Sequence, residues 1–206
     1  MVIGIIGKAG SGKDTVGEIM HKFLAQRDAR DNNYSKDKTY NWQIRKFANK
    51  LKQMISILTD TPLEVIEDPM VKEAPLGDEY KLVTYKSGKV KKTTEHTIRT
   101  LMQTLGTSWG REMISPDLWV NTLFKNYKEG SKWIITDVRF ENEAKAIKDR
   151  GGLLIKISSP NEYSFAHTSE TSLDNFTKYD SIIDNSGTLE DLEIQVISIL
   201  KFYRLI

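Results

Sequence analysis

GKAGSGKDT, residues 7–15, decides the fold, because it stands between the apolar run VIGII (residues 2–6) and a helical pattern. The stretch matches the pattern G-x-x-x-x-G-K, with Gly7, Gly12 and Lys13 in place. Glycines let the backbone curl so that its N–H groups point inward at a helix N-terminus, which suits an anion. The sequence therefore predicts a loop that grips a nucleoside triphosphate, with Lys13 reaching the β- and γ-phosphates. The alternative is a glycine-rich turn that merely links strand to helix.

The loop and a second acidic position define the predicted donor site. Asp14 stands where the pattern usually has a hydroxyl that coordinates magnesium, and Thr15 follows it. Asp137 comes directly after the apolar run WIIT (residues 133–136), where a second acid can orient magnesium through water. We expect ATP as phosphoryl donor and Mg²⁺ as cofactor, with Asp14 and Asp137 as the metal candidates. The predicted ATP-binding residues are Ala9, Gly10, Ser11, Gly12, Lys13, Asp14 and Thr15.

Short apolar runs alternate with amphipathic helical patterns along the chain, which argues for an α/β fold with a mainly parallel sheet covered on both faces. The loop falls at the carboxyl end of the first strand, where such sheets bind ligands. Between the strands, residues 80–94 predict a β-hairpin that turns at Ser87-Gly88. A helix around residues 98–105 is expected to end at Gly106. The predicted strands are residues 2–6, 42–47, 133–136, 153–157 and 181–183.

Composition limits the classes of protein and the cellular compartments that the chain fits. The chain has 206 residues, a formal net charge of +2 and no cysteine, which excludes disulfides and thiolate zinc sites. No apolar run approaches the roughly 20 residues of a membrane span, and no secretory signal is visible. Residues 158–200 hold eight acidic side chains against Lys178 alone. We expect a cytoplasmic protein with no membrane partner, and no nucleic-acid partner because no motif for one is present.

Several motifs resemble those of the phage deoxynucleoside monophosphate kinases. The G-K-x-T order of residues 12–15 is similar to theirs and, more distantly, to that of animal-type phosphomevalonate kinases. The resemblance implies a single phosphate-loop kinase domain over residues 1–206, with three α/β/α layers. It also implies an acceptor-binding insertion at about 60–130, a lid-like segment at about 158–180, a homodimer, and a host cytoplasm if the chain is phage-encoded. The resemblance rests on FANKLKQMISILT (47–59), RTLMQTLGTSWGR (99–111), DVRFENEAKAI (137–147), HTSE (167–170) and IIDNSGTLEDL (182–192).

The first group of acceptor candidates lies in RTLMQTLGTSWGR. Arg99 and Gln103 are four residues apart and so share a helix face. An arginine can clamp a phosphate through two hydrogen bonds, and an amide can read a base edge. The alternative is an exposed polar face. Arg111 is a second phosphate candidate, and Trp109 is expected either to stack on a base or to lie in the core.

The second group follows the strand WIIT. The resemblance carries over Arg139, as a catalytic residue beside Lys13 and Asp137, and Asn142 and Glu143 as acceptor contacts. The alternative is a capping aspartate followed by a surface arginine. Lys8, inside the loop, is expected to touch the transferred phosphate or to face solvent.

One departure from the family pattern concerns the lid. Residues 158–180 contain no arginine, although related enzymes often place one after the third strand. Arg139, Arg111, Arg150 or Lys178 would then supply the charge that stabilises the transferred phosphoryl group, a contribution that can reach several powers of ten in rate.

The resulting hypothesis is a kinase that moves the γ-phosphoryl group of ATP onto a (deoxy)nucleoside 5′-monophosphate. One alternative is a kinase for another small phosphorylated acceptor, such as phosphomevalonate or dephospho-coenzyme A. The other is a nucleotide-binding module without turnover, which the arginine-poor lid favours.

Overall fold

The computed structural model describes residues 1–31, 36, 38, 41–160 and 168–206. The chain divides into two compact units, which are described separately. The first unit comprises residues 1–47 and 120–206, and the second is Ala48–Trp119. The insertion expected at about 60–130 overlaps most of the second unit. His167, in the motif HTSE, lies outside the described residues.

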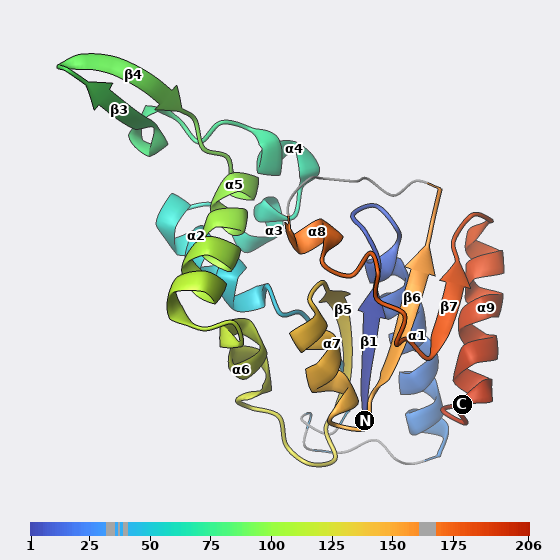
Figure 1. The fold of residues 1–206 in the computed structure, drawn as a ribbon. Coiled ribbons are helices and arrows are strands. Elements are labelled where there is room, and N and C mark those ends of the chain that lie inside the picture. The colour runs from blue at the N-terminus through green and yellow to red at the C-terminus, as the bar shows by residue number, and fades with distance from the viewer. Residues whose placement is uncertain (32–35, 37, 39–40, 161–167) are drawn as a thin grey trace. The chain divides into compact units, whose positions relative to one another are not determined.

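A five-stranded sheet in the order β2-β5-β1-β6-β7 forms the centre of the first unit, and every recorded strand pair is parallel. The five strands predicted from apolar runs are therefore confirmed, with small changes at their ends. Figure 1 shows the central position of β1 and the helices beside the sheet. The strands are β1 (Val2–Ile6), β2 (Trp42–Arg45), β5 (Lys132–Val138), β6 (Leu153–Ser158) and β7 (Ser181–Asp184).

One face of this sheet is covered by α1 (Lys13–Arg30) and α9 (Leu189–Phe202). Successive side chains of a strand point to opposite faces, so Ile3 and Ile5 of β1 meet these two helices. Met20 of α1 and Val196 of α9 are both fully buried against them. The Thr188 side chain caps the start of α9 by accepting from the N–H of Asp191.

The opposite face carries α7 (Glu141–Lys148) and the end of α6 (Leu118–Phe124). Ile147 of α7 is fully buried against this face. The Phe124 ring stacks on that of Trp133 with 5.8 Å between the ring centroids. Apolar side chains on both faces give the first unit three layers, with the sheet in the middle.

The second unit is mostly helical around a small apolar cluster that includes Leu51, Ile55 and Trp119. Gly106 does not end the helix, contrary to the prediction. The chain continues through it in η3 (Thr104–Ile114), a π-helix. A glycine terminates a helix when it adopts positive φ, and Gly106 is not among the positive-φ residues. The helical elements are α2 (Asn49–Thr59), α3 (Leu63–Ile66), α4 (Pro69–Glu73), η2 (Asp78–Tyr80), α5 (Ile98–Gln103) and η3 (Thr104–Ile114).

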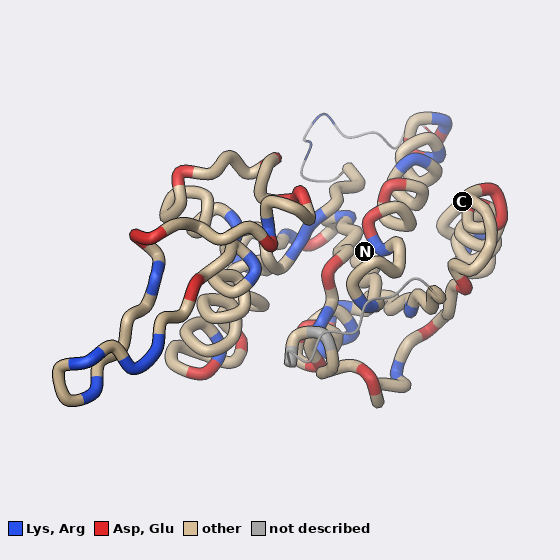
Figure 2. The backbone as a smooth tube through the Cα atoms, turned by 90° about the horizontal axis from the view of Figure 1, so that it is seen from above, with Lys and Arg blue, Asp and Glu red and all other residues tan. Residues whose placement is uncertain are grey.

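The predicted hairpin is confirmed as β3 (Leu82–Lys86) and β4 (Lys89–Thr94), with Ser87 and Gly88 at positive φ in the turn. Nearly all of its side chains are exposed. Lys86 lies directly opposite Lys89 in the pairing, and like charges in that position are destabilising. Figure 2 shows the basic residues along this hairpin, which has no acidic residue between β3 and the end of β4.

Candidate nucleotide-binding site

The loop after β1 curls as the glycine pattern predicts. Gly10 and Gly12 have φ values of 78° and 90°, in a region that side-chain-bearing residues rarely adopt. The amide of Ser11 donates to the Lys8 carbonyl oxygen, and α1 begins at Lys13. The Lys13 ammonium donates to the Lys8 carbonyl oxygen at 2.5 Å. Lys13 therefore folds back over its own loop at the N-terminal end of a helix, where a phosphate group is stabilised.

A turn from the far end of the chain supports this loop. The Asn185 side chain donates to the Ser11 carbonyl oxygen at 3.0 Å. The backbone N–H of Asn185 donates to the Ser158 carbonyl oxygen at 2.8 Å. Ser11 is fully buried, and its hydroxyl has no hydrogen-bond partner among the described residues. A buried polar group without a partner is costly, so this hydroxyl fits a loop built to hold a ligand rather than a plain turn.

Thr136 connects the two acidic candidates: its hydroxyl contacts Asp14, and Asp137 follows it in the sequence. The Thr136 hydroxyl donates to the Asp14 carboxylate at 2.6 Å, and Asp137 accepts from the Phe47 amide at 2.8 Å. Lys46 also reaches Asp14, with 2.9 Å between its ammonium and the carboxylate oxygen. The acid that replaces the usual hydroxyl is therefore held by a threonine and a lysine that the sequence analysis did not single out.

The donor set at this place fits magnesium. Mg²⁺ prefers oxygen ligands, keeps several waters and is commonly held by one or two carboxylates together with substrate phosphates. Asp14 and Asp137 offer such carboxylates beside the loop. Among the residues that the structure describes, no cluster of three acidic, histidine or cysteine side chains could hold a metal ion. The use of Asp14 and Asp137 in metal binding stays a prediction.

Arg139 directly follows the carboxyl end of β5, and a residue in the first turn of α7 holds its main chain by a hydrogen bond. Glu143 is only 2% exposed and accepts from the amides of Arg139 at 2.7 Å and Phe140 at 3.1 Å. The Asn142 side chain accepts from the Glu143 amide at 3.1 Å. Glu143 and Asn142 thus cap the helix and orient Arg139, whereas the guanidinium of Arg139 reaches toward the Ser169 carbonyl oxygen.

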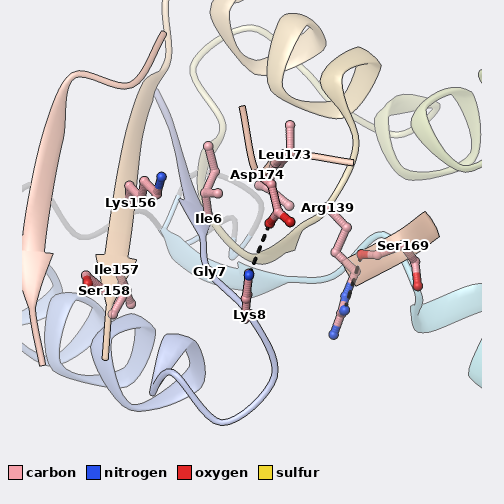
Figure 3. A pocket seen from close by; sticks show the side chains of 11 residues that line it. Ile6, Gly7, Lys8, Arg139, Lys156, Ile157, Ser158, Ser169, Leu173 and Asp174 are labelled. Carbon is pink, nitrogen blue, oxygen red and sulfur yellow. Dashed lines mark hydrogen bonds and ion pairs between the residues drawn. The ribbon is translucent and has the colours of Figure 1, made fainter. Parts of the chain in front are cut away.

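A pocket of about 400 Å³ opens beside the loop, at the carboxyl ends of β1, β5 and β6 (Figure 3). It contains Lys8, whose ammonium lies 3.3 Å from a carboxylate oxygen of Asp174. In the view of Figure 3, this ion pair lies between Lys156 and Arg139. The lining residues are Ile6, Gly7, Lys8, Val138, Arg139, Lys156, Ile157, Ser158, Ser169, Leu173 and Asp174.

Arg150, one of the four cations considered for the lid role, lies at the other end of the first unit. The Arg150 guanidinium sits 3.9 Å from the centroid of the Phe124 ring and donates to the Ala146 carbonyl oxygen, beyond the C-terminal end of α7. Lys178 is exposed and precedes Asp180, whose amide pairs with Leu154 at the amino end of β6. The proposal for Arg150 is therefore wrong, because the loop lies at the carboxyl end of the strands, whereas the proposal for Lys178 stays a prediction.

The remaining acceptor candidates belong to the second unit. Arg99 forms an ion pair with Glu73, and it shares α5 with the partly exposed Gln103. The Arg111 guanidinium donates to the Pro116 carbonyl oxygen at 3.0 Å. Trp109 packs against the apolar cluster of this unit, which agrees with the core alternative for its ring. These residues come from one sequence motif, and their use in binding stays a prediction.

The sequence analysis missed five residues of the site, and only two of them had a visible signal. Lys156 interrupts the apolar strand LLIKI, and Asn185 lies in the quoted motif IIDNSGTLEDL. Lys46, Thr136 and Asp174 had no visible signal, because their importance comes from contacts with Asp14 and Lys8 across the fold.

The arrangement of the first unit is that of a phosphate-loop kinase fold. The loop follows the central strand of a parallel sheet, and the helix that it opens covers one face. The chain belongs to the deoxynucleotide monophosphate kinase family, whose model matches residues 24–196. That match begins after the loop, so the geometry of the loop is evidence independent of the family match.

A curated relative agrees with the family. A protein of Acanthamoeba polyphaga mimivirus, which carries the provisional name of a deoxynucleotide monophosphate kinase, is 46% identical over 66 residues. The aligned part covers 32% of this chain and 34% of that relative. Within the described ranges, no helix combines the length and apolar character that crossing a membrane requires.

Proposed function

We propose that the chain is a magnesium-dependent kinase that transfers the γ-phosphoryl group of ATP to a deoxynucleoside 5′-monophosphate. The observation that carries the proposal is the curled loop with Lys13 folded over it, in a chain of this family. The loop amides and Lys13 would hold the β- and γ-phosphates of the donor. Arg139 follows β5, which runs parallel to β1. It would therefore act from the same edge of the sheet as the loop.

The reaction asks for little covalent chemistry from the protein. A non-bridging oxygen of the acceptor phosphate attacks the γ-phosphorus, and the bond from that phosphorus to the β–γ bridging oxygen breaks, leaving ADP. A phosphate monoester is largely a dianion at neutral pH, since its second pKa is about 6, so no general base is needed. A magnesium ion, when bound, neutralises charge on the donor phosphates. Catalysis then rests on positioning and charge neutralisation.

The test is transfer of label from γ-labelled ATP to each deoxynucleoside monophosphate, with Lys13→Ala as the variant. Lys22→Ala is the matched control, because Lys22 lies on the same helix but is exposed and pairs with Glu193. We expect Lys13→Ala to reduce transfer by at least a hundredfold and Lys22→Ala to leave it unchanged.

Each rival function has its own outcome in this assay. Transfer to phosphomevalonate or dephospho-coenzyme A, and to no nucleotide, would replace the proposed acceptor. Binding of ATP without transfer to any acceptor would indicate a nucleotide-binding module.

A further inference from the structure

Lys156 lies on a strand face that it shares with Leu154 and Ser158. It lies on β6 between Ile155 and Ile157, and it points to the same side as Leu154, which is fully buried. Its ammonium lies 5.4 Å from the centroid of the Tyr179 ring. No ion pair or hydrogen bond of this ammonium is recorded among the described residues. A lysine held on such a face without a carboxylate is expensive to desolvate, which indicates that an anion completes its surroundings.

Other charged side chains surround Lys156. Among the residues that the structure describes, the pocket lining carries the cationic side chains of Lys8, Arg139 and Lys156 together with the carboxylate of Asp174. That carboxylate is shared with Lys8 at 3.3 Å. Ser158 and Ser169 add hydroxyl groups that can donate hydrogen bonds. A cavity of about 400 Å³ is within the usual range for small-ligand sites.

We propose that this pocket binds the 5′-phosphate of the acceptor nucleotide and that Lys156 is a positioning residue for it. The inference rests on the proposed function, which supplies a phosphate acceptor that must lie close to the loop. Gly7 and Lys8 belong to both the loop and the pocket, so a phosphate held there adjoins the donor site. Residues 158–180 hold no arginine, and Lys156 supplies a cation from the strand that precedes them.

Asp174 acts as the internal counter-ion of the pocket. It neutralises Lys8 in the structure, and an incoming phosphate competes with it for that ammonium. Removal of the carboxylate therefore strengthens phosphate binding, whereas removal of the Lys156 charge weakens it. Two opposite effects from one pocket are difficult to obtain from a general loss of stability.

The experiment measures binding by calorimetry for three ligands: a deoxynucleoside monophosphate, the corresponding deoxynucleoside and MgATP. Lys156→Met keeps the length and apolar stem of the side chain, and we expect it to weaken monophosphate binding about tenfold or more. Binding of the deoxynucleoside and of MgATP stays unchanged. Lys156→Arg recovers most of the affinity, and Lys22→Met, at an exposed lysine of α1 outside the pocket lining, has no effect.

Asp174→Asn is the second variant, because the carboxylate is partly exposed and its loss does not threaten folding. We expect it to strengthen monophosphate binding severalfold. Equal monophosphate affinity in the parent, Lys156→Met and Asp174→Asn would overturn the inference, and so would a loss confined to MgATP. If Lys156→Met does not fold, the Asp174→Asn result decides alone.

The two proposals fail in different ways. A parent protein that binds the monophosphate but transfers no phosphoryl group would refute the kinase proposal and leave the pocket assignment measurable. A parent that transfers phosphate normally, with Lys156→Met unchanged in binding and in KM for the acceptor, would refute the pocket assignment alone.

Discussion

Replacing Gly17 by alanine tests the packing that holds the nucleotide loop. Gly17 lies in the first turns of α1, two residues after Thr15. In an unconstrained helix this change is favourable by about 1 kcal/mol, because alanine loses less backbone entropy than glycine. Here a Cβ atom at position 17 would lie 2.4 Å from Cγ2 of Thr136, whereas carbon atoms in contact are about 3.5–4.0 Å apart.

Neither partner can yield easily. Thr136 is 1% exposed, and its hydroxyl donates to the carboxylate of Asp14, so turning its side chain breaks a partly buried hydrogen bond that is worth about 1–3 kcal/mol. Moving the helix away instead strains the core by a similar amount, about 1–3 kcal/mol for an inserted methyl group. The helical gain of about 1 kcal/mol offsets only part of the middle of either range. We therefore expect Gly17→Ala to lower the free energy of unfolding by about 1 kcal/mol.

Urea unfolding followed by circular dichroism measures this change, and a double-mutant cycle with Thr136→Ser identifies its cause. The serine removes the clashing methyl group and keeps the hydroxyl that holds Asp14. The penalty for Gly17→Ala should therefore fall by at least half in the Thr136→Ser background. A Gly17→Ala protein as stable as the parent would refute the reasoning, and so would a penalty that Thr136→Ser leaves intact.

Three further outcomes follow from other contacts. Gly12→Ala should reduce ATP affinity in calorimetry at least tenfold, because residue 12 has φ of 90° and a Cβ there would lie 2.5 Å from the Asn185 side chain; unchanged affinity would contradict the loop assignment. Arg150→Gln should lower stability by about 1 kcal/mol through loss of the contact with Phe124 and leave phosphoryl transfer unchanged, whereas a collapse of transfer would return Arg150 to the catalytic candidates. Burial raises the pKa of Glu67, but hydrogen bonds and charges from Lys52 and Lys72 outweigh it and lower that pKa below 4.5 overall. Its stabilising effect is thus present above about pH 4.5 and lost as the pH falls through the lowered value, so Glu67→Gln should unfold more easily than the parent near neutral pH, and the difference should disappear in acid.

Apolar periodicity was enough to predict the sheet. Runs such as VIGII and WIIT are short, continuous and bounded by polar residues, which is the pattern of strands buried on both faces. The loop was equally visible, because Gly10 and Gly12 are needed for its backbone conformation. Local patterns of this kind depend on neighbours in sequence.

The parts that sequence did not reveal depend on neighbours in space. Arg150 is as basic as Arg139, and only the fold shows that it lies over Phe124 while Arg139 lies at the pocket. Glu143 was proposed as an acceptor contact, and burial instead makes it the group that fixes the main chain of Arg139. Gly106 continues a helix because tertiary packing decides its conformation, not its residue type.

The central position of β1 has a consequence for how the chain is made. β1 hydrogen-bonds on both sides with β5 and β6, which are synthesised more than a hundred residues after it. The loop that follows it is supported by Asn185, 174 residues beyond Ser11. β1 must therefore remain without its native partners until those strands have been synthesised, and pairing over such separations is slow. The loop gains its support from Asn185 only after that residue has left the ribosome.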